Sequence, residues 1–258
     1  MTVEMLHGVV QKRLSIYLSL LLGVFFVCPT IASNTFTMAF NHDPANNPQY
    51  AFYQKVYQEA FATLGLEFRY QVYPSTRATQ MADHGKVDGE PQRVLGYASQ
   101  SPNQIRVNEP IFENRTLAFG IDPTLNVVDL NSLKKSDLRI DYLRGSAWSH
   151  NHLKALVDAD NLQVVDDSEQ GFMKLTKQRS DLFIVLEVIG LKTLQNNSDY
   201  YQAGVRVVGQ VGSNLSYPYV HKRHADLIPK LEQALRDMKI SGRYNQLLLE
   251  TMPYLEKR

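Results

Sequence analysis

The 258-residue chain is poor in cysteine, in tryptophan and in net charge. Its one cysteine, Cys28, excludes a disulfide framework within the chain and any metal site built from several cysteines. The 27 Lys and Arg residues nearly balance the 26 Asp and Glu residues. This balance gives no electrostatic reason to expect a nucleic-acid partner or an anionic membrane surface. The 44% of hydrophobic and 21% of charged residues argue against disorder and low complexity.

Motifs of several common enzyme and metal-binding classes are also absent. The sequence contains no Gly-x-x-x-x-Gly-Lys-[Ser/Thr], Gly-x-Gly-x-x-Gly, His-Glu-x-x-His or Gly-x-Ser-x-Gly. His150 and His152 would point to different faces of a helix, which is poor geometry for a metal ion. His221 and His224 lie in a turn flanked by Lys and Arg, and we interpret all four histidines as surface residues. We therefore expect no metal and no cofactor.

The first 33 residues have the pattern of a secretory signal. Lys12 and Arg13 precede the apolar run 14–27, which is shorter than the ~20 residues that span a bilayer. Pro29 and the small-x-small triplet that ends at Ala32 then fit a cleavage site near Ala32 or Ser33. We expect residues 1–33 to be a cleavable signal peptide and the mature protein to be periplasmic. An uncleaved anchor helix and a lipoprotein are the alternatives.

Two series of short apolar runs and amphipathic segments follow. Strands are expected at 36–40, 66–73, from Val87, 117–121, 138–143, 162–165, 182–186, 205–211 and 215–220, with Pro218 placing the last at a sheet edge. Helices are expected at 49–64, 74–81, 147–159, 168–177, 226–238 and 244–250, and a further helix follows strand 182–186 and ends near Leu194. Ser168 is the expected N-cap of helix 168–177, and 96–108 is expected to be a loop. This alternation is typical of mostly parallel sheets with crossover helices.

Several stretches resemble the family-3 bacterial extracellular solute-binding proteins, the amino-acid type of periplasmic binding protein. They are the first strand with its polar, aromatic-containing turn, Gly85-Lys86-Val87-Asp88-Gly89-Glu90, Leu143-Arg144-Gly145-Ser146-Ala147 before a helix, the step 175–184 into a buried strand, and the ending from His224 through Tyr244. Their order and spacing cover nearly all of the mature chain.

The resemblance implies an α/β fold of the two-lobed type II class, with two mostly parallel sheets flanked by helices. The first lobe would comprise 34–120 plus 208–258, and the second lobe 121–207. Two crossing strands, near 117–121 and 205–211, would form a hinge. A ligand would lie between the lobes and close them.

The chemistry of a cleft between two lobes, together with the resemblance, suggests which residues hold the ligand. Gly145, Ser146 and Ala147 begin a helix whose free N–H groups suit a carboxylate or phosphate, although a plain strand-to-helix turn is the alternative. The other candidates are Arg77 and Arg93 for a carboxylate, Glu90 and Glu187 for an ammonium group, and Phe40, His42 and Tyr50 as an aromatic wall. Surface exposure or lobe packing is the alternative for each.

One departure from the family concerns the carboxylate clamp. Amino-acid binders usually carry a Thr-x-x-Arg stretch before a Ser-x-Pro-Tyr-like segment. Here 107–110 matches the later piece, but the upstream segment 98–104 contains no Arg. The clamp is therefore absent or supplied by Arg77, Arg93 or Arg106, and an ordinary amino acid as the ligand is put in question.

The sequence thus predicts a monomeric, non-enzymatic solute-binding protein that hands a small polar or charged, amino-acid-like metabolite to the permease of an ABC-type transporter. A lyase or dehydratase-like enzyme on the same fold, with Glu90 or Glu187 as general acid, is one alternative. A sensory module that acts in trans on a receptor is another.

Overall fold

The structure is a computed structural model that describes residues 34–256. The expected signal peptide at 1–33 lies outside the described residues. Within 34–256, none of the helices combines the length and the apolar character that crossing a membrane requires.

Strands and helices alternate along the described residues, as the apolar spacing predicts. The strands are β1 (Thr35–Phe40), β2 (Glu67–Val72), β3 (Gly89–Val94), β4 (Gln104–Arg106), β5 (Phe112–Gly120), β6 (Ile140–Leu143), β7 (Leu162–Val165), β8 (Leu182–Leu186) and β9 (Arg206–His221). The α-helices are α2 (Pro48–Thr63), α3 (Ser75–Asp83), α4 (Ala147–Leu153), α5 (Ser168–Thr176), α6 (Glu187–Asn196), α7 (Ser198–Gln202), α8 (Ile228–Ile240) and α9 (Arg243–Thr251). Short 3₁₀ turns are η1 (Tyr97–Ser99), η2 (Leu130–Leu133), η3 (Ala159–Asn161), η4 (Lys222–Leu227) and η5 (Pro253–Leu255).

The first lobe consists of β1–β4 with helices α2, α3, α8 and α9. Its strand β1 pairs in parallel with β2 and β3. Helix α2 starts where the side chain of Asn47 accepts hydrogen bonds from the N–H groups of Gln49 and Tyr50. Its apolar residues, including Phe52 and Phe61, pack with β1 and with helices α8 and α9 in one buried cluster.

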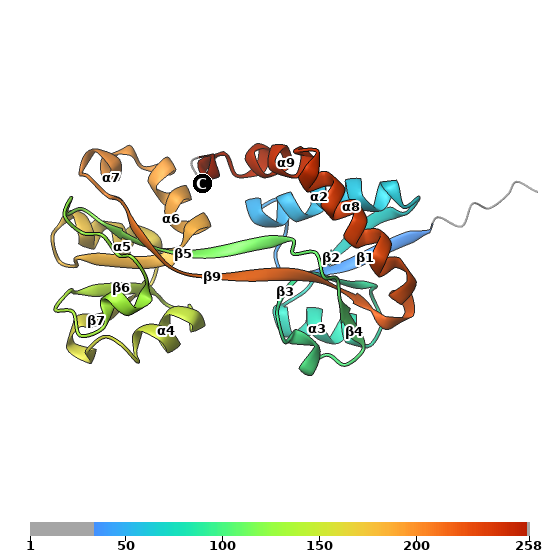
Figure 1. Cartoon of the computed structure of the whole chain (residues 1–258), viewed down its shortest axis with the longest axis horizontal. Coiled ribbons are helices and arrows are strands. Elements are labelled where there is room, and N and C mark those ends of the chain that lie inside the picture. Colours follow the sequence, from blue (N-terminus) through green and yellow to red (C-terminus); the bar gives the residue numbers. More distant parts are fainter. Residues whose placement is uncertain (1–33, 257–258) are drawn as a thin grey trace, which may run out of the picture. The chain divides into compact units, whose positions relative to one another are not determined.

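The second lobe consists of β6–β8 with helices α4–α7. Its strand β6 pairs in parallel with β7 and β8. One buried cluster lies between this sheet and α4, and a second lies between the sheet and helices α5 and α6. The mixed α/β, two-lobed fold class expected from the sequence is therefore confirmed (Figure 1).

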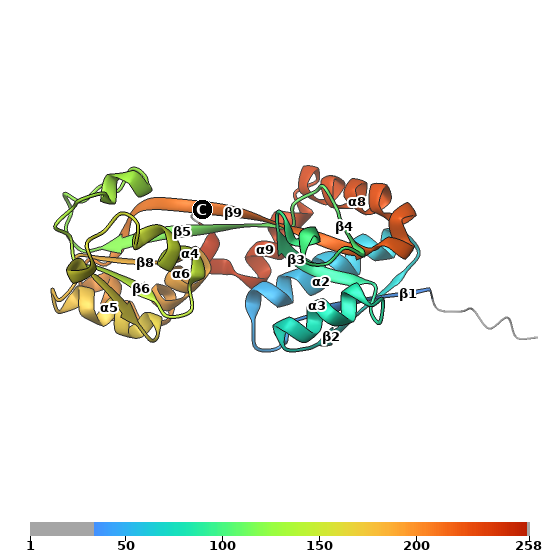
Figure 2. The same cartoon turned by 90° about the horizontal axis from the view of Figure 1, so that it is seen from below.

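Strands β5 and β9 connect the two lobes and pair with each other in antiparallel fashion (Figure 2). Strand β9 also pairs with β3 and β4, and β5 pairs with β8. Their pairing joins the two expected sheets into one hydrogen-bonded path among the described residues, in the order β2-β1-β3-β9-β5-β8-β6-β7. The expected hinge segments 117–121 and 205–211 lie largely in these two strands. The lobe boundaries 34–120 plus 208–258 and 121–207 stay predictions.

The prediction that Pro218 marks an edge strand is wrong. The segments 205–211 and 215–220 form the single strand β9, which lies inside the sheet. Proline has no N–H to give to a neighbour, so it is tolerated in a sheet where pairing is interrupted. The register of β3 against β9 shifts between Glu90 and Arg93, opposite Pro218.

On the other side of β9, pairing with β5 ends at Ser216 and pairing with β4 begins at Tyr219. Pro218 lies in this gap, and its carbonyl accepts the N–H of Val107 there. Because the nitrogen and carbonyl of a strand residue face the same side, the missing N–H of the proline faces the gap and costs no ladder hydrogen bond.

Three local predictions also differ from the structure. Helix α4 ends at Leu153 rather than continuing to 159, and the Leu153 carbonyl accepts the N–H groups of both Leu156 and Val157 at this end. The N-cap of α5 is Asp167, because its carboxylate accepts the N–H of Gln170 at 2.7 Å, whereas the hydroxyl of Ser168 bonds to Thr193. The expected loop 96–108 contains η1 and the short strand β4, which pairs with β9.

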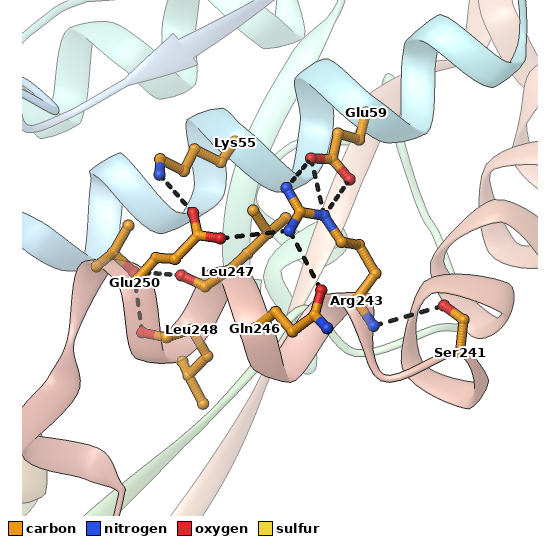
Figure 3. Close-up of polar contacts among 9 residues, drawn as sticks. Lys55, Glu59, Ser241, Arg243, Gln246, Leu247, Leu248 and Glu250 are labelled. Atoms are coloured by element: carbon orange, nitrogen blue, oxygen red, sulfur yellow. Dashed lines mark hydrogen bonds and ion pairs between the residues drawn. The ribbon is translucent and has the colours of Figure 1, made fainter.

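The C-terminal helix α9 is fastened to α2 by charged side chains (Figure 3). The guanidinium of Arg243 donates to both carboxylate oxygens of Glu59, with its Nη2 2.6 Å from Oε1. Lys55 donates to Glu250 at 2.8 Å. These contacts set the position of α9, and the chain then continues into η5 against α6.

Candidate functional site

A cavity of about 680 Å³ lies between the first turn of α2 and helices α5 and α6. We call it the cleft cavity, because residues of both lobes line it. The first lobe and the connecting strand β5 contribute Asn41, His42, Asn46, Asn47, Pro48, Gln49, Tyr50, Gln92 and Asn114. The second lobe contributes Ser168, Glu169, Leu186, Val188, Ile189, Lys192, Thr193 and Asn196, and Tyr254 comes from η5. Seven of these eighteen lining residues carry amide side chains, so the cavity offers both donors and acceptors to a polar solute.

Tyr50 organises the wall of the cleft cavity that belongs to the first lobe. Its hydroxyl donates to Asn41 and accepts a hydrogen bond from Nε2 of Gln92 at 3.3 Å. Burial raises the pKa of Tyr50 above its ordinary value, so the phenol remains a neutral donor. The His42 ring lies edge-on to Tyr50, with centroids 5.2 Å apart. Two of the predicted aromatic residues are therefore brought together at this cavity.

A chain of amide hydrogen bonds ties α2 to the two connecting strands. Nε2 of Gln49 donates to Oδ1 of Asn114 at 3.1 Å. Nδ2 of Asn114 then donates to the hydroxyl of Ser216 at 2.8 Å. Asn114 is in β5 and Ser216 in β9, so this chain fixes the floor of the cleft cavity to the strands that connect the lobes.

A second cavity of about 430 Å³ adjoins Arg93, and we call it the arginine cavity. Its lining consists of Ser75, Thr76, Thr79, Gln92, Arg93, Val94, Tyr97 and Gln100. Gln92 lines both this cavity and the cleft cavity, so the two adjoin across one side chain. Helix α3 begins here after Pro74, which provides no side-chain cap for its first N–H groups.

The predicted residues Glu90 and Arg93 pair with each other. Nε of Arg93 lies 3.1 Å from Oε1 of Glu90, and its Nη2 donates to the same oxygen and to Thr79 at 3.0 Å. The hydroxyl of Tyr97 donates to Oε2 of Glu90. Burial disfavours the guanidinium charge, but the hydrogen bond and negative charge of Glu90 raise the pKa of Arg93 above its ordinary value.

The predicted residue Glu187 pairs with Arg115. Its Oε1 lies 3.0 Å from Nη2 of Arg115 in an ion pair, and its Oε2 accepts a hydrogen bond from Nε at 3.1 Å. The two meet because Thr116 of β5 is the register partner of Leu186, the residue before Glu187. Both line a third cavity of about 630 Å³, the hinge cavity, together with residues of α6, β9 and η5.

The remaining predicted residues line none of these three cavities within 34–256. Phe40 is fully buried and stacks on Tyr70, with centroids 5.0 Å apart, so it packs the first lobe. Arg77 is exposed and lies over the ring of Tyr73. Gly145, Ser146 and Ala147 begin α4, where Gly145 has φ +82° and the Ser146 hydroxyl caps the N–H of Ser149. A ligand role for any of these residues stays a prediction.

Sequence reasoning missed Gln92, Asn114, Lys192 and Tyr254. Gln92 lies beside Arg93 on a predicted strand, so its neighbourhood could have been inferred. Asn114 and Lys192 carry no local signal in the sequence. Tyr254 lines the cavity because the chain reaches it from α9, whose position depends on its contacts with α2. These contacts join residues far apart in sequence, so no local pattern indicates them.

Within 34–256, no group of three or more His, Cys, Asp or Glu side chains is arranged to hold a metal ion. The two histidines at 221 and 224 lie near Asp88, which accepts from His224 at 2.7 Å and from Arg223. This cluster ties η4 to the turn that precedes β3.

Comparison with known proteins gives one sequence relative and many similar folds. No protein-family model matches the chain. An uncharacterized protein of Shewanella oneidensis is 31% identical over 245 residues, which are 88% of this chain and 92% of the relative. The L-cystine solute receptor of Neisseria gonorrhoeae, in its unliganded open conformation, has a TM-score of 0.68 at 17% identity and covers 86% of this chain and 94% of its own.

Two other solved structures with this fold have different roles. A histidine kinase sensor domain with similarity to periplasmic binding proteins has a TM-score of 0.56 at 12% identity, covering 86% of this chain and 96% of its own. An ancestral amino acid-binding protein, a precursor of cyclohexadienyl dehydratase, has a TM-score of 0.54 at 14% identity, covering 85% and 95%. The fold is thus that of the family-3 solute-binding proteins, on which binding, sensing and an evolutionary route to catalysis all occur.

Proposed function

We propose that this chain, which belongs to one family with the Shewanella oneidensis protein and has the two-lobed fold of the family-3 solute-binding proteins, captures a small polar or charged metabolite in the cleft cavity. The observation that carries the proposal is the lining of that cavity. Polar side chains of both lobes face one space of about 680 Å³. A solute that contacts both lobes stabilises the arrangement in which they approach each other.

In the proposed role, the protein works in the periplasm as a monomer and passes its solute to the permease of an ABC-type transporter. The signal pattern at 1–33 and the fold of its structural neighbours support this location. Hinge closure is a suitable signal for a permease, because the closed form exists mainly when solute is bound.

A thermal-shift screen followed by calorimetry tests the proposal. The panel contains amino acids, amines, sugars and organic acids. A solute at 100 times its Kd adds about 2.7 kcal/mol to the free energy of unfolding. Removing one cavity hydrogen bond in Gln92→Ala or Asn114→Ala is expected to weaken binding about tenfold, or ~1.4 kcal/mol. Asn245→Ala on the exposed face of α9 is the matched control and leaves Kd unchanged. If none of the solutes in the panel shifts the melting temperature, the proposal is contradicted.

A lyase or dehydratase-like enzyme is the second candidate, because a dehydratase precursor shares the fold. A general acid must contact the substrate within hydrogen-bond distance. Glu90 and Glu187 are 1% and 3% exposed, and an arginine occupies each carboxylate. The geometry therefore favours binding over catalysis. Mass spectrometry of each binding solute after overnight incubation with the protein distinguishes the two, since an enzyme forms product.

A sensory module that acts in trans is the third candidate, because a kinase sensor domain shares the fold. Affinity purification from membranes with the bound solute present separates this role from transport. A transporter permease in the purified material supports the proposal, whereas a receptor in its place supports the sensory role.

A further inference from the structure

We infer that the solute is an organic acid that carries no ammonium group, and that its acid group binds Arg93. This inference rests on the proposed function and goes further, because it names the class of solute and the residue that selects it. The uncharged polar part of the solute extends past Gln92 into the cleft cavity, since Gln92 lines both spaces.

Arg93 is built to receive an anion in the arginine cavity. Its Nε and Nη2 are held by Glu90 and Thr79, whereas none of the hydrogen bonds found among the described residues uses Nη1. The side chain is 19% exposed and borders the cavity with the hydroxyl groups of Ser75, Thr76 and Thr79. A guanidinium whose Nε and Nη2 are already fixed by hydrogen bonds loses less conformational entropy when Nη1 binds a carboxylate than a mobile guanidinium does.

The acid group nearest to Arg93 cannot accept an ammonium group. An α-amino acid carries its ammonium on the carbon next to the carboxylate, so its acceptor must lie close to Arg93. Glu90 is the acid at that place, but it is only 1% exposed. Its Oε1 accepts from Arg93, and its Oε2 accepts from the hydroxyl of Tyr97. No Asp or Glu of the described chain lines the arginine cavity.

The other predicted ammonium acceptor is also occupied. Glu187 is bound through both oxygens to Arg115 and borders the hinge cavity rather than the cleft cavity. Among the described residues, the one acid that lines the cleft cavity, Glu169 of the second lobe, does not line the arginine cavity, so it does not lie beside a carboxylate bound to Arg93.

The fixed charges around the two adjoining cavities favour an anion. Within 34–256, Arg93 and Lys192 line these cavities together with one acid, Glu169, whereas Glu90, the carboxylate that pairs with Arg93, is buried and lines neither cavity. A zwitterionic amino acid brings an ammonium group, which Arg93 and Lys192 repel. An acid without an ammonium group brings only the carboxylate, which these cations attract.

Matched pairs of solutes that differ only in one group test the inference. Lactate and alanine, malate and aspartate, and 3-phenyllactate and phenylalanine each exchange a hydroxyl group for an ammonium group. Titration calorimetry of the purified chain gives Kd for each, with glycerol, glucose and glutaramide as uncharged probes. We expect at least one hydroxy acid to bind tenfold or more tightly than its amino partner.

Variants assign the effect to Arg93. Arg93→Gln is expected to weaken binding of the hydroxy acid tenfold or more, whereas Arg179→Gln, an exposed arginine outside all three cavities, leaves it unchanged. Because Arg93→Gln leaves buried Glu90 without its cation, the double variant Glu90→Gln/Arg93→Gln is measured as well. Circular dichroism confirms that it is folded, and binding must still be lost.

Each other outcome contradicts a defined part of the reasoning. Equal or tighter binding of the amino acid, or binding of an uncharged probe alone, overturns the inference and leaves the proposed function standing. Anion binding that survives in the folded double variant overturns the role of Arg93. Binding of no solute, here and in the wider panel, overturns the inference together with the proposed function.

Discussion

The structure indicates that Glu187 stabilises the fold rather than contacting a ligand, and removing its charge tests this. In Glu187→Gln the side chain keeps its shape, but Arg115 loses the carboxylate that it binds through two nitrogen atoms. Removing one partner of a fully buried ion pair costs roughly 3 to 5 kcal/mol. Arg115 is 20% exposed, so water can solvate part of the remaining charge. We therefore expect the free energy of unfolding to fall by about 2 to 3 kcal/mol.

Urea denaturation of a double-mutant cycle measures this cost. The variants are Glu187→Gln, Arg115→Gln and the two combined. Since the charge left behind causes most of the loss, the double variant should be no less stable than either single variant. The control is the Arg144–Asp166 pair of the same lobe, in which both side chains are 67% exposed. Asp166→Asn is expected to cost less than about 1 kcal/mol. Equal losses in Glu187→Gln and Asp166→Asn would refute the argument from burial.

Two further predictions concern pH and packing. Burial opposes ionisation of Asp88, but hydrogen bonds from the Thr37 N–H, Arg223 and His224 lower its pKa below the ordinary value of 3.8. The unfolded chain thus takes up the proton first, so this stabilisation is complete above pH ~4 and disappears as the pH falls through the lower, folded-state pKa. Acid titrations of stability should accordingly show a shallower loss below pH 4 in Asp88→Asn than in the parent, and parallel curves would contradict this. Gly212→Ala would place a Cβ 2.3 Å from Cζ2 of Trp148, so overpacking should lower stability by roughly 1 to 3 kcal/mol, seen as a lower urea midpoint. An unchanged midpoint would show that Trp148 moves freely.

The sequence predicts the helices and strands well where apolar spacing is regular. Helices α2, α5 and α9 and strands β1, β7 and β8 lie within two residues of their predicted bounds, because burial of one face imposes the spacing. Strand β4 was missed because three residues are too few to show a period. The continuity of β9 was missed because Pro218 is a strong breaker signal, and its tolerance depends on the gap between the pairings of β9 with β5 and β4, which are distant in sequence.

In the candidate site, too, local features could be predicted from the sequence, whereas contacts between distant residues could not. Local patterns predicted that His42, Tyr50, Glu90 and Arg93 lie near strand ends, and these residues do border or support adjoining cavities. Local patterns could not predict that each glutamate would be bound by an arginine, since the pairing depends on register and on a bulge. The pairing changes the chemistry of the site, because a carboxylate that is buried and already bonded no longer attracts an ammonium group. The amino-acid character expected from the resemblance therefore depends on residues that the folded chain uses for its own structure, and the exposed edge of Arg93 is left to select the solute by its negative charge.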